Sequence, residues 1–226
     1  MDREETLSKS FKRIGKEYGY DSVEAEFAAF KEFKVRWQRS YRWAEFKVSD
    51  YLMDAPAEVV DDLAATLFSK ITCSGRKNGS TAMRDWVTNP AFAKYKQPVY
   101  LRRSRNLKRT HVGENHDLRE SHARLVGAGL LTDDPQLHLS WAKESLSKKS
   151  AFCSVLMKVV GISPVFDDAD VPEFVVDYLV YTQCVRVAAA KETFGDYDGH
   201  DFRPLEKRYP RWEEAEGWLD RLCMYR

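Results

Sequence analysis

Apolar and polar positions follow two different periods in the first third of the chain. Apolar residues recur at helical spacing within residues 4–18, which predicts a short amphipathic helix. In residues 33–37 and 44–48 apolar and polar side chains alternate, and a short polar break separates the two segments. A period of two is typical of half-buried strands, so we expect a β-hairpin there. Its polar face would carry Lys34, Arg36, Arg42 and Lys47.

Helical periodicity returns after the hairpin. Residues 54–71 contain apolar side chains four positions apart, and their first residues, Asp54 and Pro56, are typical of a helix start. Turn-forming residues, chiefly glycine and an Asn-Pro pair, divide the following sequence into shorter pieces. The pattern in these pieces predicts three more helices, at 80–87, 90–96 and 117–127.

Two apolar segments in the second half predict strands. Residues 134–143 alternate in polarity, whereas 151–166 form a nearly continuous apolar run, as expected for a central strand. The strongest helical pattern follows at 171–192, with two more helices at 201–208 and 211–224. No segment repeats another. This order of elements predicts an α+β fold in which a small mixed or antiparallel sheet packs on helices.

The length and composition indicate one folded domain. The 226 residues are 43% hydrophobic, which is sufficient for a buried core. We expect a single domain over 1–226, divided into an N-terminal helical arm (1–30), a hairpin and helix (31–71), a helical and basic insertion (72–132) and the main core (133–226). The four cysteines form no C-x-x-C pair, so a zinc ribbon is not expected. The charged N-terminus and the lack of an 18-residue apolar run predict a cytoplasmic protein that does not enter a membrane.

One face of the long predicted helix has the spacing of a metal site. Val175, Tyr178, Leu179, Thr182 and Arg186 share this face, because residues three and four apart lie on the same side of a helix. In zincins, two histidines separated by three residues bind zinc from such a face. The glutamate after the first histidine acts as general base.

The surrounding sequence resembles a known family. The run FCSVLMKVVGISPVFDDADVPEFVVDYLVY (152–181), followed by G-x-x-x-G-x-DFRPLEKRYPRWEEAEGWL (195–219), is similar to the SprT-like and YgjP-like zinc metallopeptidases. The hairpin and SDYLMDAPAEVVDDLA (49–64) resemble the front half of the YgjP-like branch. The resemblance covers roughly residues 30–70 and 135–225. It implies a zincin-like core, with a strand, a helix that bears H-E-x-x-H, and a third histidine four residues before an aromatic residue.

This chain departs from the family motif at every ligand and base position. Threonine is a poor zinc ligand, glutamine cannot accept a proton, and arginine is a permanent cation. One remaining carboxylate does not complete a three-ligand zinc site. We therefore expect no peptidase activity, no bound zinc and no other cofactor. The vestigial positions are Thr182, Gln183, Arg186 and Asp198, with His200 two residues out of register.

Two hypotheses follow from these replacements. An ion pair between Arg186 and Asp198 would hold the long helix against the following loop without a metal. The alternative is a hydrolase with a rewired metal site built from His200, Asp198 and Cys184.

A basic segment at 100–109 is the clearest sign of a partner. It contains five cations in ten residues, although the net charge of the chain is only +1. Cations neutralise phosphates and aromatic rings stack on unpaired bases, so this segment and the aromatic hairpin are typical of nucleic-acid binding. The family resemblance also implies action at DNA. The candidate nucleic-acid-binding residues are Arg102, Arg103, Arg105, Lys108 and Arg109.

Other interpretations of the same segments stay open. The 35 acidic residues could neutralise the basic segment as an ordinary solvated face. A peptidase-like cleft without chemistry could also hold a peptide, which would make the chain a protein-interaction or scaffold subunit. The sequence thus predicts a catalytically inactive, metallopeptidase-like binding module with nucleic acid or protein as its partner. It does not indicate the oligomeric state.

Overall fold

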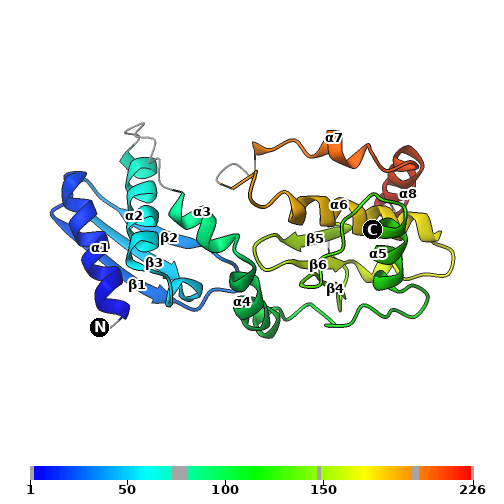
Figure 1. Ribbon diagram of the computed structural model, residues 1–226, viewed down its shortest axis with the longest axis horizontal. Coiled ribbons are helices and arrows are strands. Elements are labelled where there is room, and N and C mark those ends of the chain that lie inside the picture. Colours follow the sequence, from blue (N-terminus) through cyan, green and yellow to red (C-terminus); the bar gives the residue numbers. More distant parts are fainter. Residues whose placement is uncertain (1–2, 73–80, 147–148, 195–198, 225–226) are drawn as a thin grey trace. The chain divides into compact units, whose positions relative to one another are not determined.

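The protein is a mixture of helices and small sheets. The structure, a computed structural model, describes all of the chain except residues 1–2, 73–80, 147–148, 195–198 and 225–226 (Figure 1). The described residues form eight α-helices and six strands, which confirms the predicted α+β class. The strands form two three-stranded sheets, where one sheet was expected. None of the helices in the described ranges is long and apolar enough to cross a bilayer.

The chain divides into two compact units, Met1–Phe92 and Ala93–Arg226, which we call the first and second unit. Their boundary falls inside the segment 72–132 that the sequence pattern had set apart as an insertion. Each unit has its own sheet and its own helices.

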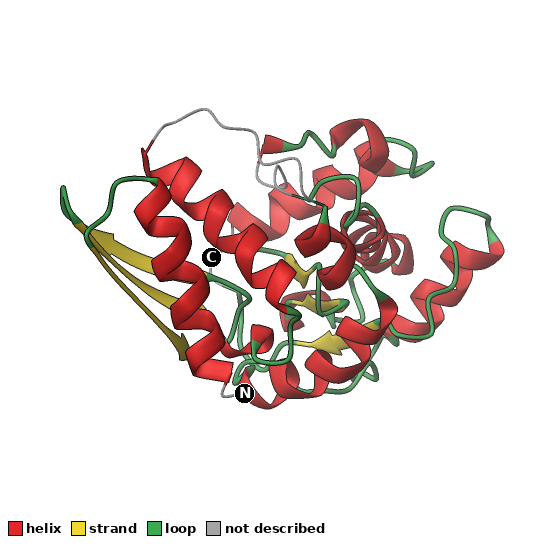
Figure 2. Cartoon of the chain, turned by 60° about the vertical axis from the view of Figure 1, so that its left-hand side comes forward, coloured by secondary structure: helices red, strands yellow, loops and turns green. Residues whose placement is uncertain are grey.

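The first unit is a three-stranded sheet covered by helices. Strand β3 is central, parallel to β1 and antiparallel to β2. The predicted hairpin is therefore confirmed as β2 and β3, whereas β1 was not predicted. Figure 2 shows one three-stranded sheet nearly edge-on, with helices along one side. The elements are α1 (Arg3–Glu17), β1 (Ser22–Ala28), β2 (Val35–Arg39), β3 (Trp43–Ser49), α2 (Ala57–Thr72) and α3 (Ala82–Val87).

Aromatic rings form the centre of the first unit. Phe68 of α2 is fully buried, and its ring lies 5.1 Å from Phe46 of β3 and 5.3 Å from Tyr20. The two helices α1 and α2 lie side by side (Figure 1). Gly15 permits this close approach, because a Cβ there would lie 2.9 Å from Cζ of Phe68 in α2, and also 2.5 Å from a methyl group of Val23 in β1. Apolar positions at helical and strand spacing therefore meet in one core, as their periodicity predicts.

The second unit is built around the predicted long helix. Helices α5 and α6 pack against each other, and β6 is the central strand between β4 and β5. The long apolar run 151–166 is a hairpin rather than one strand. The run was predicted as one strand because its turn also contains apolar residues, such as the fully buried Met157. The turn is marked instead by the backbone of Lys158, which has a positive φ of 50°. The elements are α4 (Pro90–Arg103), α5 (Leu118–Gly127), β4 (His138–Trp141), β5 (Ala151–Ser154), β6 (Val159–Ile162), α6 (Glu173–Ala188), α7 (Arg203–Glu206) and α8 (Trp212–Met224).

The two units repeat one order of elements, which corrects the expectation that the chain has no internal repeat. Each has a helix, a strand, a two-stranded hairpin, a 3₁₀ turn and a second helix. In each sheet the first and third strands are parallel and the second and third antiparallel. The 3₁₀ turns, Asp50–Leu52 and Pro164–Phe166, follow Ser49 and Ser163, which share nearly the same backbone angles.

The repeat extends to individual residues. The segments that begin at Pro56 and Pro172 share the pattern P-x-x-V-V-D-x-L-x-x-T, which ends at Thr66 and Thr182. The aspartates of this pattern pair with an arginine of the unit's first helix in both copies: Asp61 with Arg13, and Asp177 with Arg124. The buried positions of α1 and α5 also match: Leu7, Ser10, Phe11 and Ile14 correspond to Leu118, Ser121, His122 and Leu125.

Candidate functional site

Helix α6 carries the face on which the family motif would lie. Its residues 175–182 are buried, because the helix packs against β5 and β6 and also contacts α7 and α8. We call the residues Tyr178, Thr182 and Arg186 the motif face.

Arg186 forms an ion pair across the motif face, but with a different partner from the one predicted. Its Nη2 lies 2.5 Å from Oε1 of Glu206 in α7, and its guanidinium lies 4.9 Å from the ring centre of Phe202. A charge-assisted bond therefore joins α6 to the segment that follows it. Asp198 lies outside the described residues, so its pairing with Arg186 stays a prediction.

The side chains at the other described vestigial positions make local contacts. The Thr182 hydroxyl is buried and donates to the carbonyl of Leu179 at 3.0 Å. The Gln183 amide donates to the Thr182 hydroxyl at 3.3 Å. His200 is exposed, with its ring 4.6 Å from that of Phe202. No three His, Cys, Asp or Glu side chains converge as metal ligands in the described part of the chain. The residues there do not fit a zincin site.

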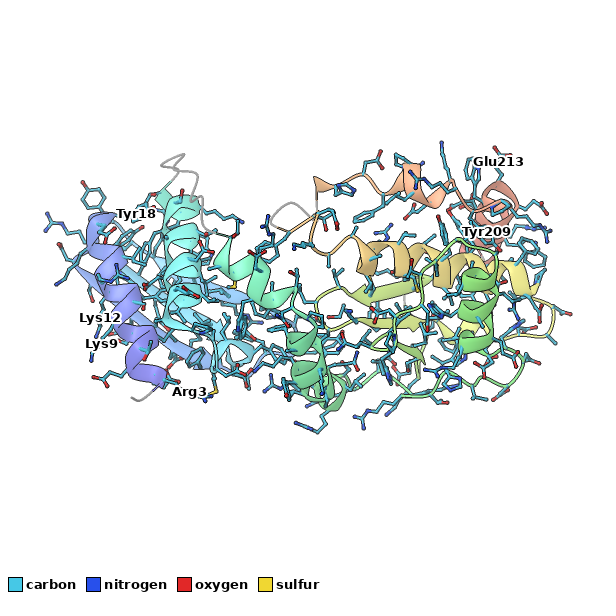
Figure 3. All side chains as sticks on the ribbon, in the orientation of Figure 1. Arg3, Lys9, Lys12, Tyr18, Tyr209 and Glu213 are labelled. Carbon is cyan, nitrogen blue, oxygen red and sulfur yellow. The ribbon has the colours of Figure 1, made fainter. Side chains whose placement is uncertain are left out.

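Three tyrosine hydroxyls form hydrogen bonds between α6 and the segments around the motif face. The Tyr178 hydroxyl donates to Glu216 of α8 at 2.5 Å, and the Tyr181 hydroxyl donates to the carbonyl of Leu205 at 2.8 Å. Tyr209 lies beside α6 (Figure 3), and its hydroxyl donates to the carbonyl of Phe174. Its ring packs at a tilt against both tyrosine rings, at centroid distances of 5.4 and 5.7 Å. Burial raises the pKa of Tyr178, and the hydrogen bond to Glu216 raises it further. These groups are neutral donors that tie α6 to the segments that cover it.

A cavity of about 670 Å³ lies along the C-terminal half of α6. Its wall is mainly apolar, with Leu130, Val187 and Leu205, and it also includes Cys184 and His200. Burial raises the pKa of the Cys184 thiol to about 12. A thiol that stays protonated at neutral pH is a poor nucleophile and a poor metal ligand. The cavity therefore offers mainly apolar contact. Asp198 of the alternative metal site lies outside the described residues, so that hypothesis stays a prediction.

The predicted basic segment lies along the outer edge of β4. The Lys108 N–H donates to the carbonyl of Trp141 at 2.9 Å, and the Trp141 N–H donates to the carbonyl of Thr110 at 3.0 Å. Leu107 is buried and forms an antiparallel bridge with Ala142. Because its backbone is held in this way, the segment presents its charged side chains from a fixed support.

Four of the five basic side chains of this segment are exposed. Arg103 is half-buried, and the other four candidates are exposed. Within the described ranges, no carboxylate lies at salt-bridge distance from those four: Arg102, Arg105, Lys108 and Arg109.

The cations of the hairpin differ from those of the basic segment. Lys47 lies 2.9 Å from Glu26, and Arg42 lies 3.4 Å from Asp21. The hairpin is therefore partly neutralised by β1 and by Asp21 just before it, a segment that was not predicted to form a strand.

Sequence reasoning also missed an aromatic residue near the basic segment. Tyr95 on α4 is 66% exposed, with the Lys94 ammonium 5.9 Å from its ring centre. It precedes Arg102 by seven residues, so the two lie on the same side of α4. Helix α4 continues through Pro98 to Arg103, whereas the predicted helix ended at residue 96. A longer predicted helix would have placed Tyr95 and Arg102 on one face from their spacing alone.

The loop that follows the basic segment is anchored by Asp167. Its carboxylate accepts the backbone N–H groups of Glu114 at 2.7 Å, Asn115 at 2.9 Å and His116 at 3.1 Å. Gly113 is required for this approach, because a Cβ there would lie 2.4 Å from the carboxylate. Burial raises the pKa of Asp167, but the three N–H bonds together outweigh it and hold the pKa below its ordinary value.

Replacing Asp167 with asparagine is expected to lower the free energy of unfolding at pH 7 by about 1–2 kcal/mol, because charge-assisted bonds to three N–H groups are weakened. The folded pKa is depressed, so this contribution is present above the ordinary pKa of 3.8 and is lost as the pH falls through the folded value. Urea unfolding between pH 7 and pH 2 measures it. The gap between variant and parent should close at low pH.

The neighbouring variant Asp168→Asn is the matched control. The Asp168 carboxylate accepts one N–H, from Asp170 at 2.9 Å, so its loss should change stability by a few tenths of a kcal/mol. Equal effects of the two variants would contradict the anchoring role of Asp167.

Comparisons of the chain with protein-family models, with curated proteins and with solved structures find no match. The resemblance to the SprT-like and YgjP-like peptidases therefore rests on the sequence runs given above. The geometry of the described residues carries the functional argument.

Proposed function

We propose that the protein is a non-catalytic binding module that holds nucleic acid through the basic segment of its second unit. The observation that carries this proposal is the set of four exposed cations at 102–109 without a carboxylate at salt-bridge distance in the described ranges. Free cations are available to neutralise phosphates, whereas paired cations are not.

The support of the segment suits this role. Hydrogen bonds to Trp141 fix the backbone on the edge of β4, so fewer conformations are lost when a ligand binds. The exposed Tyr95 adds a ring on which an unpaired base can stack. An arginine can bind a phosphate in bidentate fashion. These features favour single-stranded nucleic acid.

We further propose that the second unit has a zincin-like core whose chemistry has been lost. The proposal rests on the family resemblance and on the motif face, where Arg186 and Glu206 form an ion pair at the position of a zinc ligand. An arginine on this face repels a divalent cation. No hydrolytic step is assigned to these residues.

Removing the four free cations is expected to abolish binding. Arg102→Ala, Arg105→Ala, Lys108→Ala and Arg109→Ala combined should weaken affinity for a labelled 20-nucleotide single strand by at least about 100-fold. The slope of log affinity against log salt should fall by about 3, since each phosphate contact on a single strand contributes about 0.7. Fluorescence polarisation at several salt concentrations measures both quantities.

The matched control removes four cations that already have carboxylate partners: Lys9, Arg42, Lys47 and Arg211. This variant loses the same net charge, and its affinity should change less than about threefold. Tyr95→Ala should weaken binding about tenfold and leave the salt slope unchanged, because stacking releases no counterions. Salt-independent binding by the parent, or equal loss in both four-site variants, would contradict the proposal.

The second candidate is a protein-interaction subunit, favoured by the apolar cavity beside α6. A protein partner held there should be retained by the variant that lacks the four free cations. Pull-down at moderate salt with that variant separates the two functions.

A further inference from the structure

The repeat allows the outer edges of the two sheets to be compared. In the second unit, the N–H groups of His138 and Ala142 donate to β6, so the backbone groups of Trp141 and Lys143 point away from the sheet. Those outward groups are bonded to residues 106–110, which lie along β4 like a fourth strand. This edge is therefore filled by the protein's own chain.

The equivalent edge in the first unit is that of β1. Ser22 pairs with Trp43 as His138 pairs with Val159, and the Ser22 N–H donates to β3. By the same alternation, the backbone groups of Ala25 and Phe27 point outward. The Phe27 N–H is accepted by the carboxylate of Glu4, at 3.3 and 3.4 Å.

No described segment of the first unit forms a strand along β1 as residues 106–110 do along β4. Within the described part of this unit, the outward groups of Ala25 form no hydrogen bond. An unpaired strand edge is a template for another strand.

The charge of this edge differs from that of its counterpart. Glu24 and Glu26 are exposed on β1, at the positions that the buried Ser140 and Ala142 occupy in the second unit. Glu26 has Lys47 at 2.9 Å, while Glu24 has no cation at salt-bridge distance among the described residues. Both carboxylates lie on the same sheet face, since they are two residues apart in a strand. The open edge of β1 is therefore acidic.

We propose that the outer edge of β1 binds an extended basic peptide of a partner protein. The peptide adds a fourth strand antiparallel to β1, as residues 106–110 do on β4, and hydrogen-bonds with Ala25. Every second side chain of the peptide lies on the same sheet face as Glu24 and Glu26, beside their carboxylates. Lysine or arginine at these positions therefore matches the charge of this edge. The choice of a basic partner rests on charge complementarity, and the geometry rests on the filled edge of the sister unit.

The test uses the full-length protein and a capped, labelled eight-residue peptide in which threonine alternates with arginine and lysine. Fluorescence polarisation at low salt should show saturable binding. Glu24→Lys and Glu26→Lys combined should weaken it at least about tenfold, equivalent to about 1.4 kcal/mol. The control variant Glu213→Lys and Asp220→Lys makes the same charge change on α8 and should leave the affinity unchanged.

Two control peptides separate strand addition from simple charge attraction. A peptide of the same composition with its cations in one block presents them to both faces, and should bind at least about tenfold more weakly. Methylation of alternate backbone nitrogens keeps the charge but removes donors, and should abolish binding. Absence of saturable binding, or equal binding of the methylated peptide, would overturn the proposal. The peptide test and the nucleic-acid test use variants of different residues, Glu24 and Glu26 in one and the cations at 102–109 in the other, so either proposal can fail without the other.

Discussion

Phe68→Ala is expected to lower the stability of the first unit by about 3–5 kcal/mol, the range for removing a fully buried phenylalanine. Its ring lies among those of Phe11, Tyr20 and Phe46, with centroid distances from 5.1 to 6.3 Å. Truncation leaves a cavity between α2 and the sheet, and also removes favourable ring-edge contacts. Such a loss is a large part of the 5–15 kcal/mol that stabilises a typical domain.

Hydrogen exchange resolved by peptide is the appropriate measurement, because it reports on each unit separately. Protection should fall in α1, β1 and β3 and stay unchanged in the second unit. The repeat supplies the control, since Cys184 occupies the equivalent position on α6 and is also buried. Cys184→Ala removes one sulfur atom and should cost about 1 kcal/mol, confined to the second unit. Equal loss of protection in both units would show that they unfold together.

Arg124→Ala is expected to destabilise the second unit by about 2–3 kcal/mol. Arg124 Nε and Nη2 donate to the two oxygens of Asp177 at 3.0 and 2.7 Å, and Nη2 also donates to the Ser121 hydroxyl. Asp177 is 8% exposed, so the variant leaves a nearly buried carboxylate without its cation. A fully buried pair would cost about 3–5 kcal/mol, and the 38% exposure of the Arg124 side chain reduces the expected loss through solvent screening.

The equivalent pair in the first unit is the control for this prediction. Arg13 and Asp61 lie 2.7 Å apart, but their side chains are 56% and 36% exposed. Exposed pairs contribute about 0–1 kcal/mol, so Arg13→Ala should have a small effect. Chemical denaturation of both variants, with a double-mutant cycle for each pair, measures the two coupling energies. A cost for Arg124→Ala no greater than that of Arg13→Ala would show that burial does not strengthen the second pair.

Most helices could be predicted from the sequence, because their apolar spacing reports directly on one buried face. The helices at α1, α2, α5, α6 and α8 were expected close to their observed bounds. The strands were harder. β1 was missed although Val23, Ala25 and Phe27 alternate with polar residues there, and β5 and β6 were taken as one strand because the turn between them is apolar and partly buried. Local polarity does not separate a buried turn from a buried strand.

The repeat was hidden for a different reason. The shared residues lie in α1, α2, α5 and α6, whereas the strands between them differ in polarity and the loops in length. Only the pairing of the strands reveals that the two units have one topology. Parallel pairing of the first and third strands joins residues that are distant in sequence, and no local pattern encodes it.

For the candidate site, too, the sequence predicted local features and did not predict the contacts between distant segments. The sequence by itself determined that Thr182, Gln183 and Arg186 occupy one turn of helix and that cations cluster at 102–109, because spacing and composition are local properties. The tertiary structure decided that Arg186 pairs with Glu206 and that the hairpin cation Lys47 pairs with Glu26. It also placed the basic segment on the edge of β4. Which charges neutralise each other depends on distances across the fold, and chain order does not fix those distances.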